Sequence, residues 1–153
     1  MRPTLPAQLS RRMVDAAVAA AQEMSVPVTV VMVDESGVLK ELCRMDGAAL
    51  VSVDTAVRKA YAAAAIGMPP DDFYAAIERD GAAVASFANR PRLALIAGGL
   101  PVRVNGRVAG AIGVAGAMTA AEDRRIAEAA AGASRQLGSA VGRGRAAAGG
   151  QGA

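Results

Sequence analysis

The sequence contains no histidine, and this absence excludes more chemistry than any other feature of its 153 residues. Without an imidazole there is no Ser-His-Asp or Cys-His catalysis, no common zinc site and no histidine ligand for haem. Any chemistry must therefore use carboxylates, lysine, arginine, tyrosine, cysteine or backbone groups.

Cysteines, aromatic residues and long apolar runs are also scarce. Cys43 is the only cysteine, which excludes an internal disulfide and with it a secreted disulfide scaffold. Residues 1–10 lack a basic region followed by an apolar run, and no uncharged apolar stretch reaches the roughly 18 residues that a membrane-spanning helix needs. We therefore expect a cytoplasmic protein with no membrane partner.

The positive charge is small and scattered. The net charge is +3, there is no tryptophan, and the Arg11-Arg12 and Arg124-Arg125 pairs are typical of solvated helix faces. A nucleic-acid-binding protein would show a basic stripe or aromatic stacking platforms. We expect no nucleic-acid partner.

Small apolar residues dominate what is present. Hydrophobic residues make up 53% of the chain, mostly Ala, Val, Leu and Met, and this length is normal for one domain with its own core. The composition changes to Gly and Ala from residue 142 onward. We predict a single domain over residues 1–141, followed by a flexible Gly/Ala-rich tail over residues 142–153.

The first half of the chain predicts a helix, a hairpin and a second helix. A helical spacing of three and four connects Leu9, Met13, Ala16, Ala20 and Met24. Residues 28–34 and 38–44 are rich in strand-forming side chains around a Ser36-Gly37 turn, which indicates a hairpin. Residues 53–66 then predict an Ala-rich helix, with Ser52 as its N-cap and Gly67 at its end.

The second half predicts a shorter helix over residues 71–80, three strands and a last helix. Residues 82–91 fit either a short helix or an irregular connection. The strands are expected at 93–97, 100–104 and 107–115, with Asn105-Gly106 supplying the positive φ angles of a type I′ turn. Thr119 and Glu122 form a capping box that begins the last helix, and Asp123 adds to the favourable charge at its first turn.

Hairpins without regular βαβ alternation indicate an antiparallel sheet of about five strands that is covered by helices, an α+β fold. Gly110, Gly113 and Gly116 resemble a dinucleotide fingerprint in spacing only. They lie on a predicted hairpin strand instead of a βα turn, so we do not expect them to bind a nucleotide.

Several motifs together resemble the GlcG/HbpS-like family, which includes the C-terminal part of PduO-type proteins. They are Arg44-Met45-Asp46-Gly47-Ala48, Lys59-Ala60 and the glycine-rich segments 98–102 and 110–116. The resemblance covers residues 8 to 138. It implies a profilin-like sheet, assembly as a homo-oligomer, and haem or corrinoid binding or haem degradation as alternatives, although this chain has Ala115 where relatives usually have Ser and offers no His ligand.

The segment after the second strand supplies two candidate ligand-binding residues. Arg44 can hold a carboxylate or phosphate through two parallel hydrogen bonds, and Asp46 can take a proton or orient a donor. An internal Arg-Asp bridge in an ordinary turn is the alternative. The resemblance favours the site.

Lys59 is one of two lysines and lies within an Ala-rich helix. If that face is buried, the ammonium can hold an anion or act as a base; a surface lysine is the alternative. Gly98 and Gly99 can present unshielded amides to an anion, or can simply allow the chain to turn.

Three function classes follow from these residues. The first is an oligomer that holds a small anionic metabolite through Arg44, Asp46, Lys59, Gly98 and Gly99. The second is a cofactor-independent isomerase, lyase or hydrolase with Lys59 and Asp46 as catalytic residues. The third is a haem or corrinoid binder. We predict no metal site.

Overall fold

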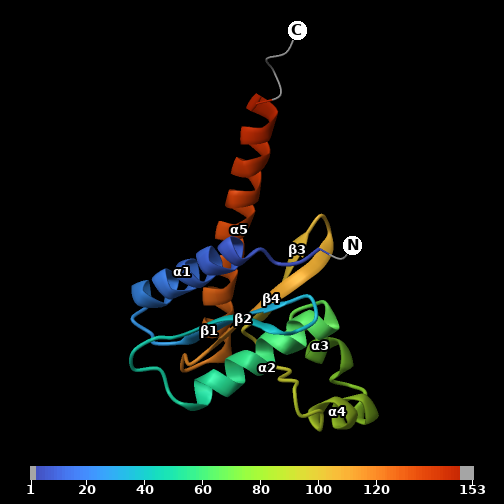
Figure 1. Ribbon diagram of the computed structural model, residues 1–153. Coiled ribbons are helices and arrows are strands. Elements are labelled where there is room, and N and C mark those ends of the chain that lie inside the picture. Colours follow the sequence, from blue (N-terminus) through green and yellow to red (C-terminus); the bar gives the residue numbers. More distant parts are fainter. Residues whose placement is uncertain (1–2, 149–153) are drawn as a thin grey trace.

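The structure is a computed structural model that describes residues 3–148, with side chains described as far as residue 135. Four strands and five helices follow one another in these residues (Figure 1). They are α1 (Ala7–Glu23), β1 (Thr29–Asp34), β2 (Leu39–Arg44), α2 (Val51–Ile66), α3 (Pro70–Ile77), α4 (Gly81–Ala88), β3 (Gly99–Val104), β4 (Arg107–Ala115) and α5 (Ala120–Ala148).

The strands form one antiparallel sheet in the order β2-β1-β4-β3. Each outer strand is joined to its inner neighbour by a hairpin, and β1 and β4 pair along the centre from Thr29 opposite Ala115 to Asp34 opposite Gly110. The predicted α+β class is therefore confirmed. The described residues form four strands, one fewer than expected.

The predicted strand at 93–97 is the one that is missing. This segment has no ladder partner, and Ile96 is 46% exposed. The Arg58 guanidinium on α2 donates to the carbonyl of Pro91, just before the segment, and holds it beside a helix instead of a strand. A short apolar run does not distinguish these two surroundings, so the sequence pattern alone was insufficient.

The hairpin between β3 and β4 turns as predicted. Asn105 has φ 52° and Gly106 has φ 78°, which are the two positive angles of a type I′ turn. The strand that follows has the predicted bounds, Arg107–Ala115.

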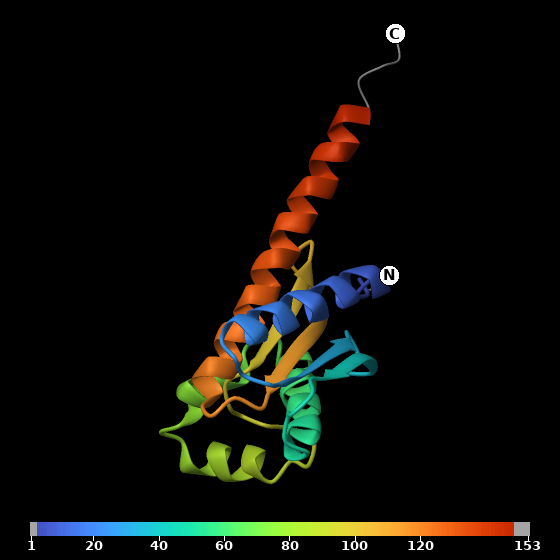
Figure 2. The ribbon, with the colours of Figure 1, turned by 90° about the vertical axis from the view of Figure 1, so that its left-hand side faces the viewer.

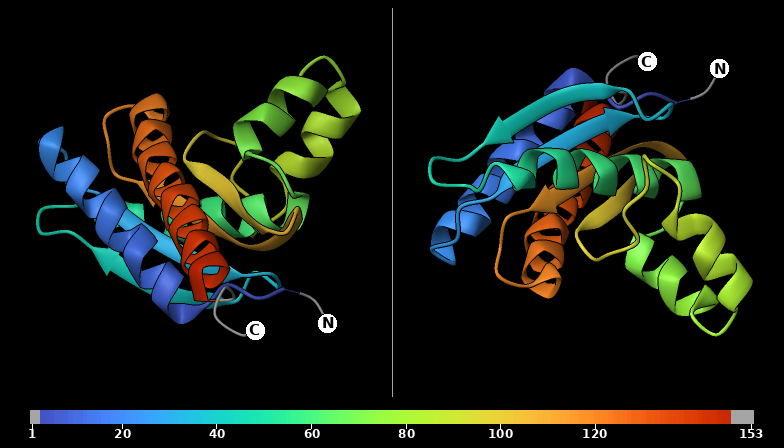
Figure 3. Two further views of the ribbon diagram at one scale, coloured as in Figure 1. Left: turned by 90° about the horizontal axis from the view of Figure 1, so that it is seen from above. Right: turned by 90° about the horizontal axis from the view of Figure 1, so that it is seen from below.

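The sheet lies between two layers of helix (Figures 2 and 3). Alternate β1 residues point to opposite faces: Val30 and Met32 join the core formed with α1 and α5, whereas Val31 and Val33 join the core formed with α2. Both faces of β1 are apolar because both are covered. This explains the unbroken apolar run at residues 30–33 of the strand, between Thr29 and Asp34.

Small residues bring α2 unusually close to β4. A Cβ atom added to Gly113 would clash with the carbonyl oxygen of Ala56 and would lie 2.7 Å from the amide nitrogen of Ala60. Gly113 therefore serves helix-sheet packing, and both Gly110 and Gly113 lie in the hairpin strand β4, where the sequence placed them.

The ends of α2 agree only in part with the prediction. Gly67 ends the helix in the left-handed region, at φ 81°, as expected. Ser52 is not the N-cap, because the helix begins at Val51 after Leu50. The Ser52 hydroxyl lies inside the first turn and contacts the Thr29 hydroxyl of β1 at 2.8 Å. It therefore connects the helix to the sheet.

The helix predicted over residues 71–80 is α3, and a second short helix, α4, occupies most of residues 82–91, for which the sequence left a helix or an irregular connection open. Both helices lie to one side of α2 (Figure 3). The predicted boundary at residue 142 falls within α5, and positions 149–153 of the predicted tail lie outside the described residues. Among the described residues no helix is both long and apolar enough to cross a membrane.

Candidate functional site

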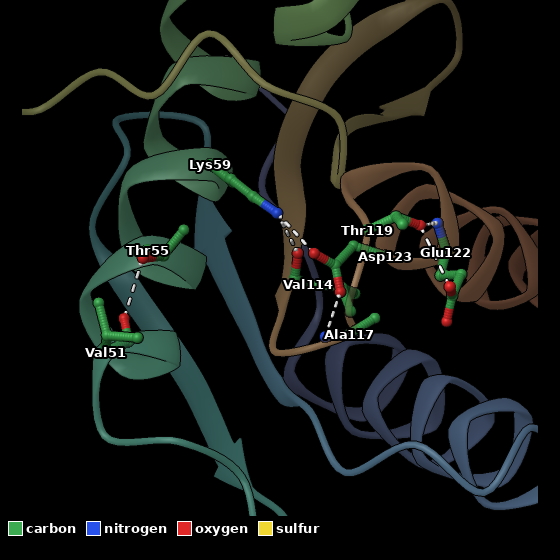
Figure 4. A network of polar contacts seen from close by, with 8 residues as sticks. All are labelled: Val51, Thr55, Lys59, Val114, Ala117, Thr119, Glu122 and Asp123. Atoms are coloured by element: carbon green, nitrogen blue, oxygen red, sulfur yellow. Dashed lines mark hydrogen bonds and ion pairs between the residues drawn. The ribbon is translucent and has the colours of Figure 1, made fainter.

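Lys59 is almost completely buried, with 1% of its surface exposed. Its ammonium reaches from α2 to the end of β4 and the start of α5 (Figure 4). There Nζ lies 2.9 Å from Oδ2 of Asp123 and 3.0 Å from the carbonyl oxygen of Val114. The helix face that carries Lys59 is therefore buried, which excludes the alternative of a surface lysine, and Lys59 forms a buried ion pair there.

Asp123 is held in place from a second direction. Its Oδ1 accepts a hydrogen bond of 3.0 Å from the amide of Ala117, in the loop between β4 and α5. Burial raises the pKa of Asp123 above its usual value, and this effect outweighs the hydrogen bonds from Lys59 and Ala117, which lower it. The fold thus increases the proton affinity of the Asp123 carboxyl group.

The pair forms part of the wall of a cavity of about 350 Å³, which we call the Lys59 cavity. Ser52, Thr55 and Lys59 line it from one face of α2, because residues three and four apart lie above one another on a helix. Ile96 closes it from the segment before β3. The other lining residues are Ala49, Val51, Ala115, Gly116, Ala117, Ala120 and Asp123.

Two helix N-termini converge on this cavity. Val51 and Ser52 belong to the first turn of α2, and Ala120 and Asp123 to the first turn of α5. Helix N-termini carry partial positive charge. The polar groups at the cavity are therefore an ammonium, a carboxyl, two hydroxyls and two positive dipole ends, all in otherwise apolar surroundings.

The predicted site residues fall into two groups. Gly98 and Gly99 are both buried beside Lys59: a Cβ atom at Gly98 would lie 2.8 Å from Nζ, and one at Gly99 would clash with the carbonyl of Lys59. These glycines let the start of β3 approach α2. They do not line the Lys59 cavity, which residues 115–117, at the end of β4 and just after it, line instead.

Arg44 and Asp46 form the other group. Both are exposed, and neither lines the Lys59 cavity. The Arg44 guanidinium donates from Nε and Nη2 to the carbonyl of Ala48, at 3.1 and 2.9 Å, and so holds the turn that leads into α2. This role is local and structural, and it resembles the alternative to a ligand site that the sequence left open, an arginine bound within an ordinary turn.

Asp123 is the site residue that sequence reasoning missed. The sequence assigns it a charge role at the helix start. Half of the neighbouring capping box forms: the Thr119 hydroxyl accepts from the amide of Glu122 at 3.2 Å. The Glu122 carboxylate, however, contacts the Thr119 hydroxyl at 3.2 Å instead of the Thr119 amide. The available signal was Lys59 itself, since a lysine buried in an Ala-rich helix needs a carboxylate partner.

The fold and this site define a class of protein: an α+β domain in which an antiparallel sheet separates two helical layers and one helix buries a lysine beneath a small cavity. The family model for haem degrading protein HbpS-like matches residues 5–132, and the chain belongs to this family. The predicted GlcG/HbpS-like resemblance is thereby confirmed.

Related proteins agree with this assignment. A protein from the dhaT-dhaS intergenic region of Citrobacter freundii is 35% identical, covering 82% of this chain and 88% of the relative, and GlcG of Escherichia coli is 35% identical, covering 69% and 80%.

Two solved structures are similar as well. A double mutant of HbpS from Streptomyces reticuli has a TM-score of 0.79 at 31% identity, covering 86% of this chain and 88% of that one. A complex of PduOC with haem has a TM-score of 0.77 at 26% identity, covering 85% and 94%.

Proposed function

We propose that this chain binds a small organic molecule in the Lys59 cavity, and that the ligand carries an oxygen acceptor such as a carboxylate. The observation that carries the proposal is the ammonium of Lys59, which is 1% exposed yet forms part of the cavity wall. A volume of about 350 Å³ is at the small end of the range found for metabolite sites.

The Lys59 ammonium has one N–H group that can donate a hydrogen bond to a ligand. Of its three N–H groups, two are used by Val114 and Asp123. The third is available to a ligand oxygen in the cavity.

Charge balance alone does not require an anion, because Asp123 neutralises Lys59. Support for an anionic ligand comes instead from the N-termini of α2 and α5, whose dipoles both favour negative charge at this place.

Acid-base catalysis on the same ligand is the second candidate, and the raised pKa of Asp123 favours it. A carboxyl group with increased proton affinity beside an ammonium can exchange a proton with a bound carbonyl compound. In this version Asp123 takes the role that the sequence suggested for Asp46.

Haem is the ligand that the related PduOC complex suggests. The residues of this chain do not fit it at the Lys59 cavity, whose lining contains no histidine, cysteine, tyrosine or methionine to ligate iron. The nitrogen of Lys59 is already engaged with Asp123. The proposed ligand is therefore not haem.

Native mass spectrometry of the chain purified from its own host tests the proposal. We expect a small organic ligand to be retained by the wild type and by Lys40→Met, and lost from the double variant Lys59→Met/Asp123→Leu. The double variant removes both charges together, so no unpaired charge is left buried. Retention of the same mass by all three proteins, or retention of haem, would reject it.

A further inference from the structure

We propose a second binding site, for a flat organic anion, in a separate cavity of about 400 Å³ between α2 and the segment that follows α4. We call it the Tyr61 cavity. It shares no lining residue with the Lys59 cavity. The residues that carry the argument are Tyr61, Ile66, Phe87, Arg90, Arg92 and Leu93.

The aromatic side chains of the cavity are held in place. Tyr61 packs against Gly37 in the turn between β1 and β2, where an added Cβ atom would lie 2.6 Å from the tyrosine ring. Phe87 meets Phe73 of α3 edge to face, with ring centroids 5.0 Å apart. Two of the chain's four Phe and Tyr rings thus line this cavity, and the other two, Phe73 and Tyr74, lie on α3.

An arginine lies over each of the two lining rings. The guanidinium carbon of Arg92 is 3.7 Å from the centroid of Tyr61, and that of Arg90 is 4.9 Å from the centroid of Phe87. Stacking leaves the N–H edges of a guanidinium free to donate sideways. Each arginine is therefore oriented without its hydrogen-bonding capacity being consumed by the ring.

These two cations have no carboxylate partners among the described residues. The ion pairs of that part of the chain involve Arg58, Lys59 and Arg124 but neither Arg90 nor Arg92. No acidic residue lines the Tyr61 cavity. Two positive charges thus face a cavity whose remaining lining is aromatic, aliphatic or proline.

The segment that carries both arginines is anchored. The Arg58 guanidinium donates to the carbonyl of Pro91 and also pairs with Asp54 at 2.8 Å. On one side of Pro91, the amide of Arg90 donates to the carbonyl of Phe87 at 3.1 Å. The segment is therefore partly ordered before a ligand binds, so less conformational entropy is lost on binding.

The ligand chemistry follows from these groups. A flat ring in the cavity can contact Ile66, Leu93 and the parts of the two aromatic rings that the arginines leave uncovered. A carboxylate or phosphate on that ring can accept paired hydrogen bonds from Arg90 or Arg92. Neutral and cationic rings of the same shape lack this contact, so the site selects for aromatic anions.

The probes are 2-naphthoate and 1-naphthyl phosphate, with 2-naphthamide as the neutral match, titrated calorimetrically into the full chain. We expect saturable one-to-one binding of at least one anion. The affinity for the amide should be at least about tenfold weaker, which corresponds to about 1.4 kcal/mol, because the amide loses the charge-assisted hydrogen bonds. The relative affinities of the two anions distinguish a carboxylate ligand from a phosphate ligand.

The matched variants have the same net charge. Arg90→Gln/Arg92→Gln should weaken anion binding by at least about tenfold, whereas Arg79→Gln/Arg107→Gln, at exposed positions elsewhere, should leave it unchanged. Amide chemical shifts should move at Ala65 and Leu93. Equal affinity for the amide, equal loss in both double variants, shifts confined to the Lys59 cavity, or no saturation by either anion up to about 5 mM would overturn the proposal.

Discussion

Lys59 Nζ and Asp123 Oδ2 lie 2.9 Å apart although 64 residues separate them in the chain. Their side chains are 1% and 5% exposed. The pair joins α2 to α5, and the contacts with Val114 and Ala117 tie both partners to β4 and the loop after it. A buried pair is maintained only when such additional hydrogen bonds offset its desolvation.

The first prediction concerns the cost of breaking this pair. Lys59→Met should lower the free energy of unfolding by about 3–5 kcal/mol, because it leaves the Asp123 carboxylate buried without its counter-ion. Lys59→Met/Asp123→Leu should be more stable than Lys59→Met alone. Urea denaturation of the two single variants, the double variant and the wild type measures the coupling.

Lys40→Met is the control for this cycle. Lys40 is exposed and donates one hydrogen bond of 2.8 Å to the carbonyl of Leu5, so its loss should cost about 1 kcal/mol. Equal losses for the two lysine variants, or a double variant less stable than Lys59→Met, would contradict a tightly coupled Lys59–Asp123 pair.

The second prediction is a pH dependence. The pKa of Asp123 is raised above 3.8 by burial, so the folded chain binds this proton more tightly than the unfolded chain. Its contribution to stability is therefore complete below the unfolded pKa and is lost as the pH rises through the raised folded pKa.

Other carboxylates titrate in the same range, so the measured quantity is the difference in unfolding free energy between the wild type and Lys59→Met/Asp123→Leu. This difference should fall as the pH rises from about 3 and then level off by about 8. A difference that grows with pH would mean that pairing with Lys59 outweighs burial.

The third prediction tests the close approach of α2 to β4. Gly113→Ala should destabilise the protein by about 3 kcal/mol or more, since its Cβ would collide with backbone atoms of Ala56 and Ala60 that cannot rotate away. Gly132→Ala on α5 is the matched control. Nothing lies within 4 Å of its added Cβ, and it should stabilise the helix by up to about 1 kcal/mol.

Thermal unfolding of both variants would compare these effects. A mild Gly113→Ala variant would show that the helix can move away from the sheet at little cost.

The fourth prediction is that the protein is an oligomer, as the family resemblance implies. Large apolar side chains stand exposed beside the Lys59 cavity: Leu50 is 78%, Val51 71% and Met118 94% exposed. Val51 lines the cavity, and the other two adjoin lining residues in sequence. A second copy that covers these side chains would also close the cavity.

Light scattering at micromolar concentration should therefore give a mass above that of one 15.3 kDa chain. Leu50→Glu/Met118→Glu should shift the protein toward monomer. The control Ala82→Glu/Ala85→Glu, at exposed positions of α4, should not. A monomeric wild type would remove the prediction.

Local features of the sequence determined much of the fold. The Asn105-Gly106 turn, the left-handed Gly67 and the unbroken apolar run of β1 each depend on the backbone preferences or the burial of a few consecutive residues. The absence of histidine likewise restricts the chemistry whatever the fold. These features can be predicted because they depend on residues that are close together in the sequence.

The tertiary structure decided what depends on distant partners. An apolar run at 93–97 has the same pattern whether a strand or a helix lies beside it, and only the packing against α2 distinguishes the two. Likewise the sequence grouped Lys59 with Asp46 in one ligand site and did not identify Asp123 as the partner of the lysine. Asp123 became that partner because the turn after β4 brings the start of α5 to the buried end of the lysine.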